Sequence, residues 1–301
     1  MLKEYLEPNV YKAIIKSFSF NDIIEIRMRV NENIVITVKN KKYYLKNEIG
    51  EYITANTLML ENFLQKISEN SLYAYNEYIK DGYITLPKGI RVGLCGNVVT
   101  NDNKIVTIKE FQAVNIRIPH NIKNCSLPAY DFIVNDNQIN NTLIISAPGG
   151  GKTTFLRDII WQLYEHKLTA NVLVADERNE ICSVVNGEPE ISLGGFCDIY
   201  SNCSKKFAFK NGIRSMRPDV IFTDEIDLER DLDCLIEAMN CGVQVVATIH
   251  AKDIFQLKKK QGFDYVLSNK FFSRFVLLNS DNGPGTLANI YDEKLNCIYC
   301  G

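Results

Sequence analysis

The sequence predicts an α/β fold in two parts, a core over residues 141–301 behind a smaller α+β domain over residues 1–119. In the core, apolar runs alternate with longer, partly helical stretches, which is typical of a parallel sheet with crossover connections. A glycine-rich turn follows the first run and precedes a helical segment. The runs are TLIISA (142–147), NVLVA (171–175), DVIFTD (219–224) and VQVVATI (243–249).

Short strands and helices are expected in the first part. Residues 23–30 and 33–39 alternate apolar and polar side chains, as half-buried strands do. Helical spacing over 56–79 predicts two helices with a break near Ser68–Ser71. Three further strands, bounded by glycine and proline, are predicted at 82–86, 89–99 and 113–119.

The polar residues 120–140 are expected to form a linker with one short helix, able to absorb a rotation between the two parts.

The composition is that of a soluble globular protein. A net charge of −2 and a pI near 6.0 disfavour nucleic acid as a partner of the whole chain. There is no run of 18 apolar residues, and the first residues lack the apolar core of a signal peptide, so we expect a cytoplasmic location. The nine cysteines, an odd number, fit reduced thiols better than a disulfide framework.

Residues 142–160, TLIISAPGGGKTTFLRDII, nearly match the phosphate-binding pattern G-x-x-x-x-G-K-[ST], with Ser146 in place of the first glycine. Such a turn aims backbone N–H groups at phosphates, and the helix N-terminus adds positive potential. Lys152 would reach the terminal phosphates of ATP, and the Thr153 hydroxyl would ligate Mg²⁺. The alternative is a glycine-rich turn with an unrelated lysine. The predicted nucleotide-binding residues of this loop are Pro148, Gly149, Gly150, Gly151, Lys152, Thr153 and Thr154.

Two later strands end in polar residues that suit catalysis. RPDVIFTDEI (217–226) ends in Asp224, which would hold Mg²⁺ through water, and Glu225, which would polarise the attacking water as a general base. Both fall at a strand's carboxyl end, where ligands bind in open parallel sheets. VQVVATIHA (243–251) ends in Thr248 and His250, and a polar residue there can sense the γ-phosphate. A solvated acidic turn and a structural histidine are the alternatives.

NVLVADERNEI (171–181) supplies another acidic strand end. Asp176, Glu177 and Glu180 are candidates for metal or water contacts. Arginines that could meet phosphate, or equally form ordinary ion pairs, are Arg178, Arg214 and Arg217.

Several stretches together resemble the stage III sporulation protein AA family of endospore-forming bacteria. They are SAPGGGKTTFLRDII, VADERNEI, GIRSMRPDVIFTDEI, EAMNCGVQVVATIHA and GPGTLANIYD, with EIRMRV, SLYAYNEYIKDGYITLPKGIRVGLCGNVV and VNIRIP in the first part. The resemblance covers nearly the whole chain. The central motifs are shared with the type II/IV secretion ATPases, and the stretches in the first part are what indicate the sporulation family.

The resemblance implies a RecA-like P-loop ATPase core that works as a homo-oligomeric ring, a hexamer. The ring would lie at the mother-cell face of the membrane around the forespore, with membrane-embedded stage III sporulation channel proteins as partners. ATP hydrolysis would power assembly of, or transport through, that channel. Lys152 and Thr153 fall in the Walker A motif, and Asp224 and Glu225 in Walker B. ATIHA resembles the histidine box of the secretion ATPases, so His250 joins Lys152 and Glu225 as a catalytic candidate.

Two positions bear on the fit to the family pattern. Secretion ATPases usually carry an arginine two residues after the Walker B glutamate, but Asp227 stands there, so Arg230 or another arginine must take that role. Ser146, by contrast, is a residue that the sporulation family accepts.

Three other interpretations stay open: a nucleotide-dependent DNA-handling ATPase, a small-molecule kinase, and a nucleotide-gated scaffold with little turnover. The absence of a basic, aromatic-rich stripe argues against the DNA-handling ATPase. Glu225, a residue suited to activating water, favours hydrolysis of ATP over the phosphoryl transfer of a kinase. From the first part, Arg117 in NIRIP is our choice for a nucleotide contact, although it could equally pair with a nearby carboxylate. CIYC (297–300) has the spacing of half a zinc site, which only a second chain could complete.

Overall fold

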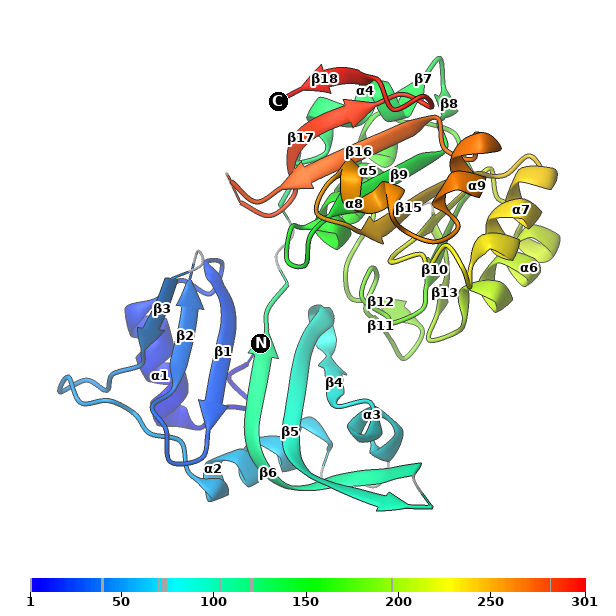
Figure 1. The fold of residues 1–301 in the computed structure, drawn as a ribbon. Helices are drawn as coiled ribbons and strands as arrows, with labels where there is room; N and C mark the ends of the chain where they lie inside the picture. Colours follow the sequence, from blue (N-terminus) through cyan, green and yellow to red (C-terminus); the bar gives the residue numbers. More distant parts are fainter. Residues whose placement is uncertain are drawn as a thin grey trace. The chain divides into compact units, whose positions relative to one another are not determined.

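The computed structural model describes residues 2–38, 41–69, 71, 75–102, 104–119, 122–195, 197–281 and 283–301. The chain divides after His120 into two compact units, each with its own apolar core (Figure 1). His120 and Asn121, at the start of the expected linker, lie outside the described residues. No helix in the described ranges is long and apolar enough to cross a bilayer.

The first unit is built on an antiparallel sheet of order β3-β2-β1-β6-β5-β4. The strands and the two helices predicted for it are confirmed, and the helix α1 and strand β3 are additional. The strands are β1 (Ile23–Arg29), β2 (Val35–Val38), β3 (Lys41–Tyr44), β4 (Tyr83–Leu86), β5 (Ile90–Asn101) and β6 (Lys104–Arg117). The helices are α1 (Pro8–Ser17), α2 (Thr57–Ile67) and α3 (Asn76–Lys80), with a 3₁₀ turn, η1 (Pro87–Gly89).

The alternation along β1 gives this sheet one buried and one open face. Ile26 and Met28 enter the core with Val10 and Ile14 of α1. The intervening side chains of β1 are polar, because successive residues of a strand point to opposite faces. The open face therefore carries the charged side chains of the central strands.

The second unit contains an eight-stranded sheet of order β13-β10-β14-β15-β9-β16-β17-β18. Neighbouring strands in the order β13-β10-β14-β15-β9-β16 pair in parallel, which confirms the predicted parallel sheet with crossovers. β17 and β18 are added to it by antiparallel pairing. The strands are β9 (Thr142–Ser146), β10 (Val172–Asp176), β13 (Cys197–Ser201), β14 (Val220–Thr223), β15 (Gln244–His250), β16 (Arg274–Asn279), β17 (Thr286–Tyr291) and β18 (Cys297–Cys300). Two short pairs lie outside it, β7 (Val134–Asn135) with β8 (Gln138–Ile139), and β11 (Val184–Val185) with β12 (Glu188–Pro189).

Helices cover both faces of this sheet (Figure 1). Ile144 of β9 faces a core that includes Phe155 of α5, whereas Leu143 and Ile145 face a second core that includes Phe209 of α6. Strands buried on both faces read as continuous apolar runs, which is why the sequence predicts them well. The helices are α4 (Tyr130–Ile133), α5 (Lys152–Glu165), α6 (Lys205–Met216), α7 (Leu232–Asn240), α8 (Ile254–Lys258) and α9 (Phe263–Ser268).

Residues 122–140 pack onto the second unit and do not form a free linker. The buried Asp158 carboxylate on α5 accepts hydrogen bonds from Asn124 N (2.8 Å), Ser126 N (2.8 Å) and Ser126 Oγ (2.6 Å). The 3₁₀ turn η2 (Leu127–Ala129) and α4 follow, and Ala129, Tyr130 and Ile133 join the core that contains the apolar side chains of α5. The polar side chains of Asn124 and Ser126 thus form hydrogen bonds with α5, and the packed residues of this stretch are not part of a free linker over 120–140.

We expect Asp158→Ala to destabilise the second unit by about 3 kcal/mol, because it leaves the buried N–H and hydroxyl groups of Ser126 without an acceptor, together with the partly buried N–H of Asn124. Trp161 is the only tryptophan of the chain and lies on α5, so its fluorescence during urea unfolding reports on this unit alone. Asp131→Ala, an exposed carboxylate in the first turn of α4, is the matched control. Equal urea midpoints for the two variants would contradict this assignment.

Candidate functional site

The glycine-rich turn between β9 and α5 is held in one compact conformation. Gly149 and Gly151 have φ of +73° and +88°, the left-handed region that glycine adopts without steric cost. A Cβ at Gly151 would collide with the backbone of Gly285, and the Gly285 N–H donates to Gly150 O at 2.9 Å. The turn is therefore packed against the loop between β16 and β17, while α5 directs its N-terminus toward it.

Ser146 and Gly150 share one space inside this turn. Ser146 is 1% exposed, and its Oγ donates to Ala147 O at 3.1 Å. A Cβ built on Gly150 would collide with this hydroxyl. The serine is thus accommodated because residue 150 has no side chain, which is the physical reason that the departure from the glycine pattern leaves the turn intact.

Lys152 lies at the centre of the turn, with its ammonium group next to His250. Its Nζ lies 3.2 Å from Ser146 O, 3.3 Å from Ala147 O and 3.1 Å from His250 Nδ1. Burial lowers the pKa of His250, and the charge of Lys152 lowers it further, so a neutral ring can accept this hydrogen bond. β15 pairs with β9 so that His250 lies opposite Ser146, which brings the histidine to the phosphate loop.

Asp224 follows β14 and is 2% exposed. Burial raises its pKa to about 7, with a further contribution from the charge of Asp176 and an opposing one from Lys205. Because folding has already removed the hydration of this carboxylate, a nearby cation would stabilise its charged form.

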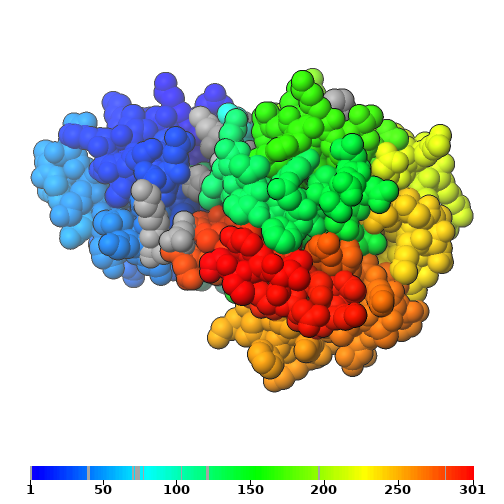
Figure 2. All heavy atoms as spheres, turned by 90° about the horizontal axis from the view of Figure 1, so that it is seen from above, coloured from blue at the N-terminus to red at the C-terminus, as the bar shows by residue number. Residues whose placement is uncertain are grey.

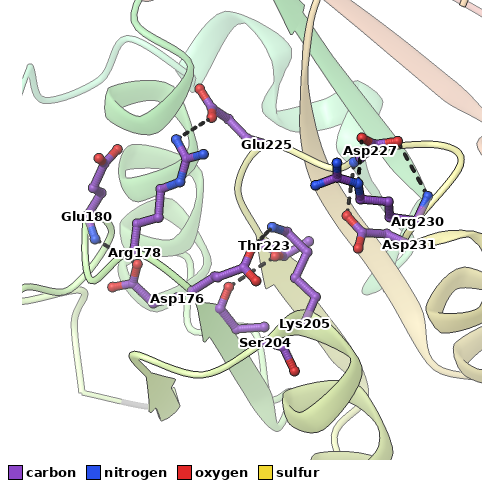
Figure 3. A network of polar contacts seen from close by, with 12 residues as sticks. Asp176, Arg178, Glu180, Ser204, Lys205, Thr223, Glu225, Asp227, Arg230 and Asp231 are labelled. Carbon is purple, nitrogen blue, oxygen red and sulfur yellow. Dashed lines mark hydrogen bonds and ion pairs between the residues drawn. The ribbon is translucent and has the colours of Figure 1, made fainter. Parts of the chain in front are cut away.

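Glu225 is held in a strained backbone conformation by its neighbours. Its φ is +36°, in the left-handed region that non-glycine residues rarely adopt. Its N–H donates to Thr248 Oγ1 at 2.8 Å, which ties the residue to β15. Its carboxylate accepts a hydrogen bond from Arg178 Nη1 at 2.9 Å, in a half-exposed ion pair (Figure 3). The backbone of Glu225 is thus fixed by Thr248 of the neighbouring strand β15, while its half-exposed carboxylate can exchange Arg178 for another partner.

The acidic stretch after β10 performs a structural task that the sequence did not reveal. Asp176 is fully buried and accepts hydrogen bonds from Glu180 N (2.8 Å), Ile181 N (3.0 Å) and Cys182 N (2.8 Å). Arg157 of α5 donates to Ile181 O at 2.9 Å and also to Glu180 O. These contacts occupy the Asp176 carboxylate with the loop, so its use as a metal ligand is not what the geometry favours.

Lys205 is a buried cation at this edge of the sheet that sequence reasoning missed. It begins α6 and is 5% exposed (Figure 3). Its Nζ lies 2.6 Å from Glu177 Oε2. The positive charge of Lys205 also lowers the pKa of Asp224, against the larger effect of burial. No motif marks Lys205, because it reaches the carboxylates only through the packing of α6 beside β10 and β14.

The arginines named from the sequence separate into different places. Arg178 reaches Glu225, as described above. Arg217, by contrast, lies where β10 and β14 begin, since its carbonyl accepts from Asn171 Nδ2 at 3.3 Å. Arg214 precedes it in the last turn of α6. Both lie at the opposite end of the sheet from the phosphate loop of their own chain. Arg230 is 86% exposed and 3.7 Å from Asp227, whose carboxylate accepts backbone N–H groups of its own turn.

Arg117 lies on the open face of the first unit's sheet. The strand register places it between Glu25 of β1 and Arg91 of β5. Burial opposes ionisation of Glu25, but hydrogen bonds from Arg27 and Asn115 and the charge of Arg117 lower the pKa of this carboxyl overall. The carboxylate neighbour considered from the sequence is therefore present, while a second arginine lies on the other side.

The polar groups at the phosphate loop suit Mg²⁺ held together with phosphate. Among the described residues, no three His, Cys, Asp or Glu side chains converge to hold a metal ion by themselves. Mg²⁺ is usually bound by one or two protein oxygens plus phosphates and water. Thr153, at the start of α5, and the buried Asp224 are the residues that would hold it.

Comparison with known proteins gives concordant matches in sequence. The family described as "Sporulation stage III, protein AA" matches residues 5–298. Stage III sporulation protein AA of Bacillus subtilis (strain 168) is 32% identical over 280 residues, which are 92% of this chain and 89% of that protein.

Among solved structures, the chain is similar in fold to an ATPase and to a pilus retraction motor, both at low sequence identity. The ATPase DotB of Yersinia pseudotuberculosis matches with a TM-score of 0.60 and 16% identity over 96% of this chain and 82% of that one. The pilus retraction motor PilT with bound ADP matches with a TM-score of 0.57 and 14% identity over 89% and 76%. The RecA-like ATPase fold expected for the core is confirmed by these likenesses.

The shared space of Ser146 and Gly150 gives a double-mutant test. We expect Gly150→Ala to lose ATP binding at least about tenfold, because the new methyl group displaces the turn. Ser146→Gly alone should change binding little, and Ser146→Gly combined with Gly150→Ala should recover most of it. The measurement is titration with a fluorescent ATP analogue. A double variant as weak as Gly150→Ala would show that the clash lies elsewhere.

Proposed function

The chain belongs to the sporulation stage III protein AA family, and from that premise and the geometry of the site we propose that it is a mechanochemical ATPase. It would hydrolyse ATP to power assembly of, or transport through, a channel between mother cell and forespore.

One observation carries the proposal of hydrolysis. The phosphate loop with Lys152, the desolvated Asp224, the fixed Glu225 and His250 lie at the carboxyl edge of one parallel sheet, on the adjacent strands β9, β15 and β14. Ligands of open parallel sheets bind at this edge. A structural turn would not need a lysine, a neutral histidine and two carboxylates around the same N-terminus of a helix.

Each residue has a distinct task in this proposal. The turn and the N-terminus of α5 bind the phosphates, and Lys152 exchanges its carbonyl contacts and His250 for phosphate oxygens. Mg²⁺, when bound by Thr153 and Asp224, neutralises charge on the phosphates. His250, freed from Lys152, is placed to sense the terminal phosphate. Glu225 leaves Arg178 and orients the attacking water, a general-base role.

The same proposal extends to assembly and location. Arg214 and Arg217 lie too far along the sheet to serve their own phosphate loop, and a neighbouring chain's nucleotide is a partner that such arginines can stabilise in trans. We therefore propose a homo-oligomeric ring, a hexamer as the family resemblance implies. It would act at the mother-cell face of the membrane around the forespore, through membrane-embedded channel proteins.

The DNA-handling alternative gains one observation from the fold. The open face of the first unit's sheet gathers basic side chains around Glu25, and part of it lines a hollow of about 420 Å³ with Tyr43 and Tyr44. The basic residues come from four strands that are separated along the chain, so they form no basic stripe in the sequence. These basic residues are Arg27, Arg29, Lys42, Arg91 and Arg117. Binding of single-stranded DNA that weakens steeply with salt would favour this alternative.

The central prediction concerns Glu225. Glu225→Gln should keep ATP binding and lose turnover by about two to four orders of magnitude, the usual cost of removing a water-positioning base. Lys152→Ala should lose ATP binding as well. Glu229→Gln, an exposed carboxylate nearby, is the control. Phosphate release and ATP-analogue titration measure the two effects, and wild-type turnover without Glu225 would leave a nucleotide-gated scaffold as the better function.

Turnover is expected to depend on self-association. Specific activity should rise with protein concentration, and Arg217→Ala should lower it at high concentration while the dilute protein binds ATP normally. The reason is that Arg217 lies away from its own phosphate loop. Lys210→Ala, an exposed cation on the same helix, should have no effect. A monomeric protein with constant specific activity would contradict the ring.

Arg117 is our proposed nucleotide-binding residue of the first unit. Arg117→Ala should weaken ATP binding severalfold, because the proposed charge-assisted contact of its guanidinium group with the nucleotide would be lost. Arg29→Ala, on the same open face, is the control. Unchanged ATP affinity in Arg117→Ala would leave Arg117 as a partner of Glu25 only.

A further inference from the structure

Cys297 and Cys300 lie on β18, the strand at the end of the eight-stranded sheet. Both side chains are exposed. Figure 2 shows the residues nearest position 301, in red, at the surface of the molecule. Nothing in the proposed ATPase site uses these thiols, since the phosphate loop follows β9, two strands away from β17.

A β-bulge places the two thiols side by side. In a regular strand, residues three apart point to opposite faces. Here Cys300 pairs with Asn289, Tyr299 with Ile290, and Cys297 with Tyr291, so β18 contains one residue more than β17 across this interval. Asn289 and Tyr291 are two apart and share a face, about 6.7 Å from each other. Their partners Cys297 and Cys300 therefore share a face as well, at a spacing that disulfides can bridge.

The thiols are already in contact. Cys297 Sγ lies 2.9 Å from Cys300 Sγ, and Asn289 Nδ2 donates to Cys297 Sγ at 3.6 Å. Two thiolates on a tetrahedral zinc ion are held about 3.8 Å apart by Zn–S bonds of about 2.3 Å. No third His, Cys, Asp or Glu joins them in the described part of the chain. The geometry is thus closer to a disulfide in its reduced form than to a metal chelate.

We propose that Cys297 and Cys300 form a redox-active dithiol that exchanges with low-molecular-weight disulfides and closes reversibly into a disulfide across the bulge of β18. This inference is independent of the ATPase site and goes beyond the proposed function.

The reaction has two displacement steps. The Cys297 thiolate attacks one sulfur of R–S–S–R, which forms a mixed disulfide and releases RS⁻. The Cys300 thiolate then attacks Cys297 Sγ, which forms the intramolecular bond and releases the second RS⁻. Two protein thiols lose two electrons and two protons, and the small disulfide gains them as two thiols.

The two sulfurs differ in a way that fits these roles. The hydrogen bond with Cys300 lowers the pKa of Cys297, whereas the same contact raises the pKa of Cys300. Cys297 is therefore the attacking thiol and Cys300 the resolving one. Elsewhere, burial raises the pKa of Cys234 to about 11 and that of Cys125 to about 12, which makes those thiols inert.

The experiment treats the full-length protein with oxidised glutathione, alkylates the remaining thiols and maps each cysteine by mass spectrometry. The exposed Cys95 and Cys241 serve as internal controls, because neither touches another thiol among the described residues. We expect residues 297–300 to lose both alkylation sites and about 2 Da, without bound glutathione, and to recover them with reductant. Cys95 and Cys241 should carry glutathione instead.

Single substitutions separate the two roles. Cys300→Ser should leave a stable glutathione adduct on Cys297, and Cys241→Ser should change nothing at residues 297–300. Adducts on Cys297 in the wild-type protein that persist like those on Cys95 would overturn the proposal. So would protection of both thiols by Zn²⁺ alone, at one ion per two chains, which would make the pair half of a metal site between chains.

Discussion

Two carboxylates, Asp176 and Asp224, are buried side by side at the carboxyl ends of the adjacent strands β10 and β14, and the site depends on how their charges are compensated. Removing two like charges from water is costly unless hydrogen bonds or cations offset it. Asp176 accepts hydrogen bonds from three backbone N–H groups, which shape the loop that follows it and oppose, without cancelling, the rise in its pKa caused by burial. Asp224 keeps a pKa raised to about 7, with Lys205 as the neighbouring charge that opposes the rise.

The different surroundings of Asp176 and Asp224 explain why the acidic residues at the end of β10 do not form a metal site with other described residues. The Asp176 carboxylate orders the backbone through Ile181, where Arg157 of α5 adds a further hydrogen bond. The loop so fixed carries Arg178, which reaches Glu225 on the next strand. The buried Asp176 carboxylate thus determines where Arg178, the partner of Glu225, lies. Asp224 is left as the carboxylate that a cation would stabilise.

The glycine-rich turn is also fixed by its surroundings, but by close packing and not by a buried charge. Its backbone is enclosed between Ser146 of β9 and the backbone of Gly285, so Gly150 and Gly151 have no room for a side chain. Lys152 is fixed in advance by two carbonyls and His250. A turn that is ordered before its ligand arrives loses less entropy on binding.

The sequence by itself determined the parallel sheet, the glycine-rich turn before α5 and the strand ends that carry Asp224, Glu225 and His250, because each depends on a local pattern. Buried strands such as β9 and β14 are continuous apolar runs, and a glycine turn before a lysine-led helix is a contiguous signal. The tertiary structure alone decided the rest. Lys205, the contact of Arg178 with Glu225 and the basic face around Arg117 are formed by residues from separate elements. The pairing of Cys297 with Cys300 depends on a bulge that exists only when β18 lies against β17. Residues 122–140 look like a linker because several of their side chains are polar, yet those of Asn124 and Ser126 form hydrogen bonds with α5, and composition cannot distinguish such groups from groups that face water.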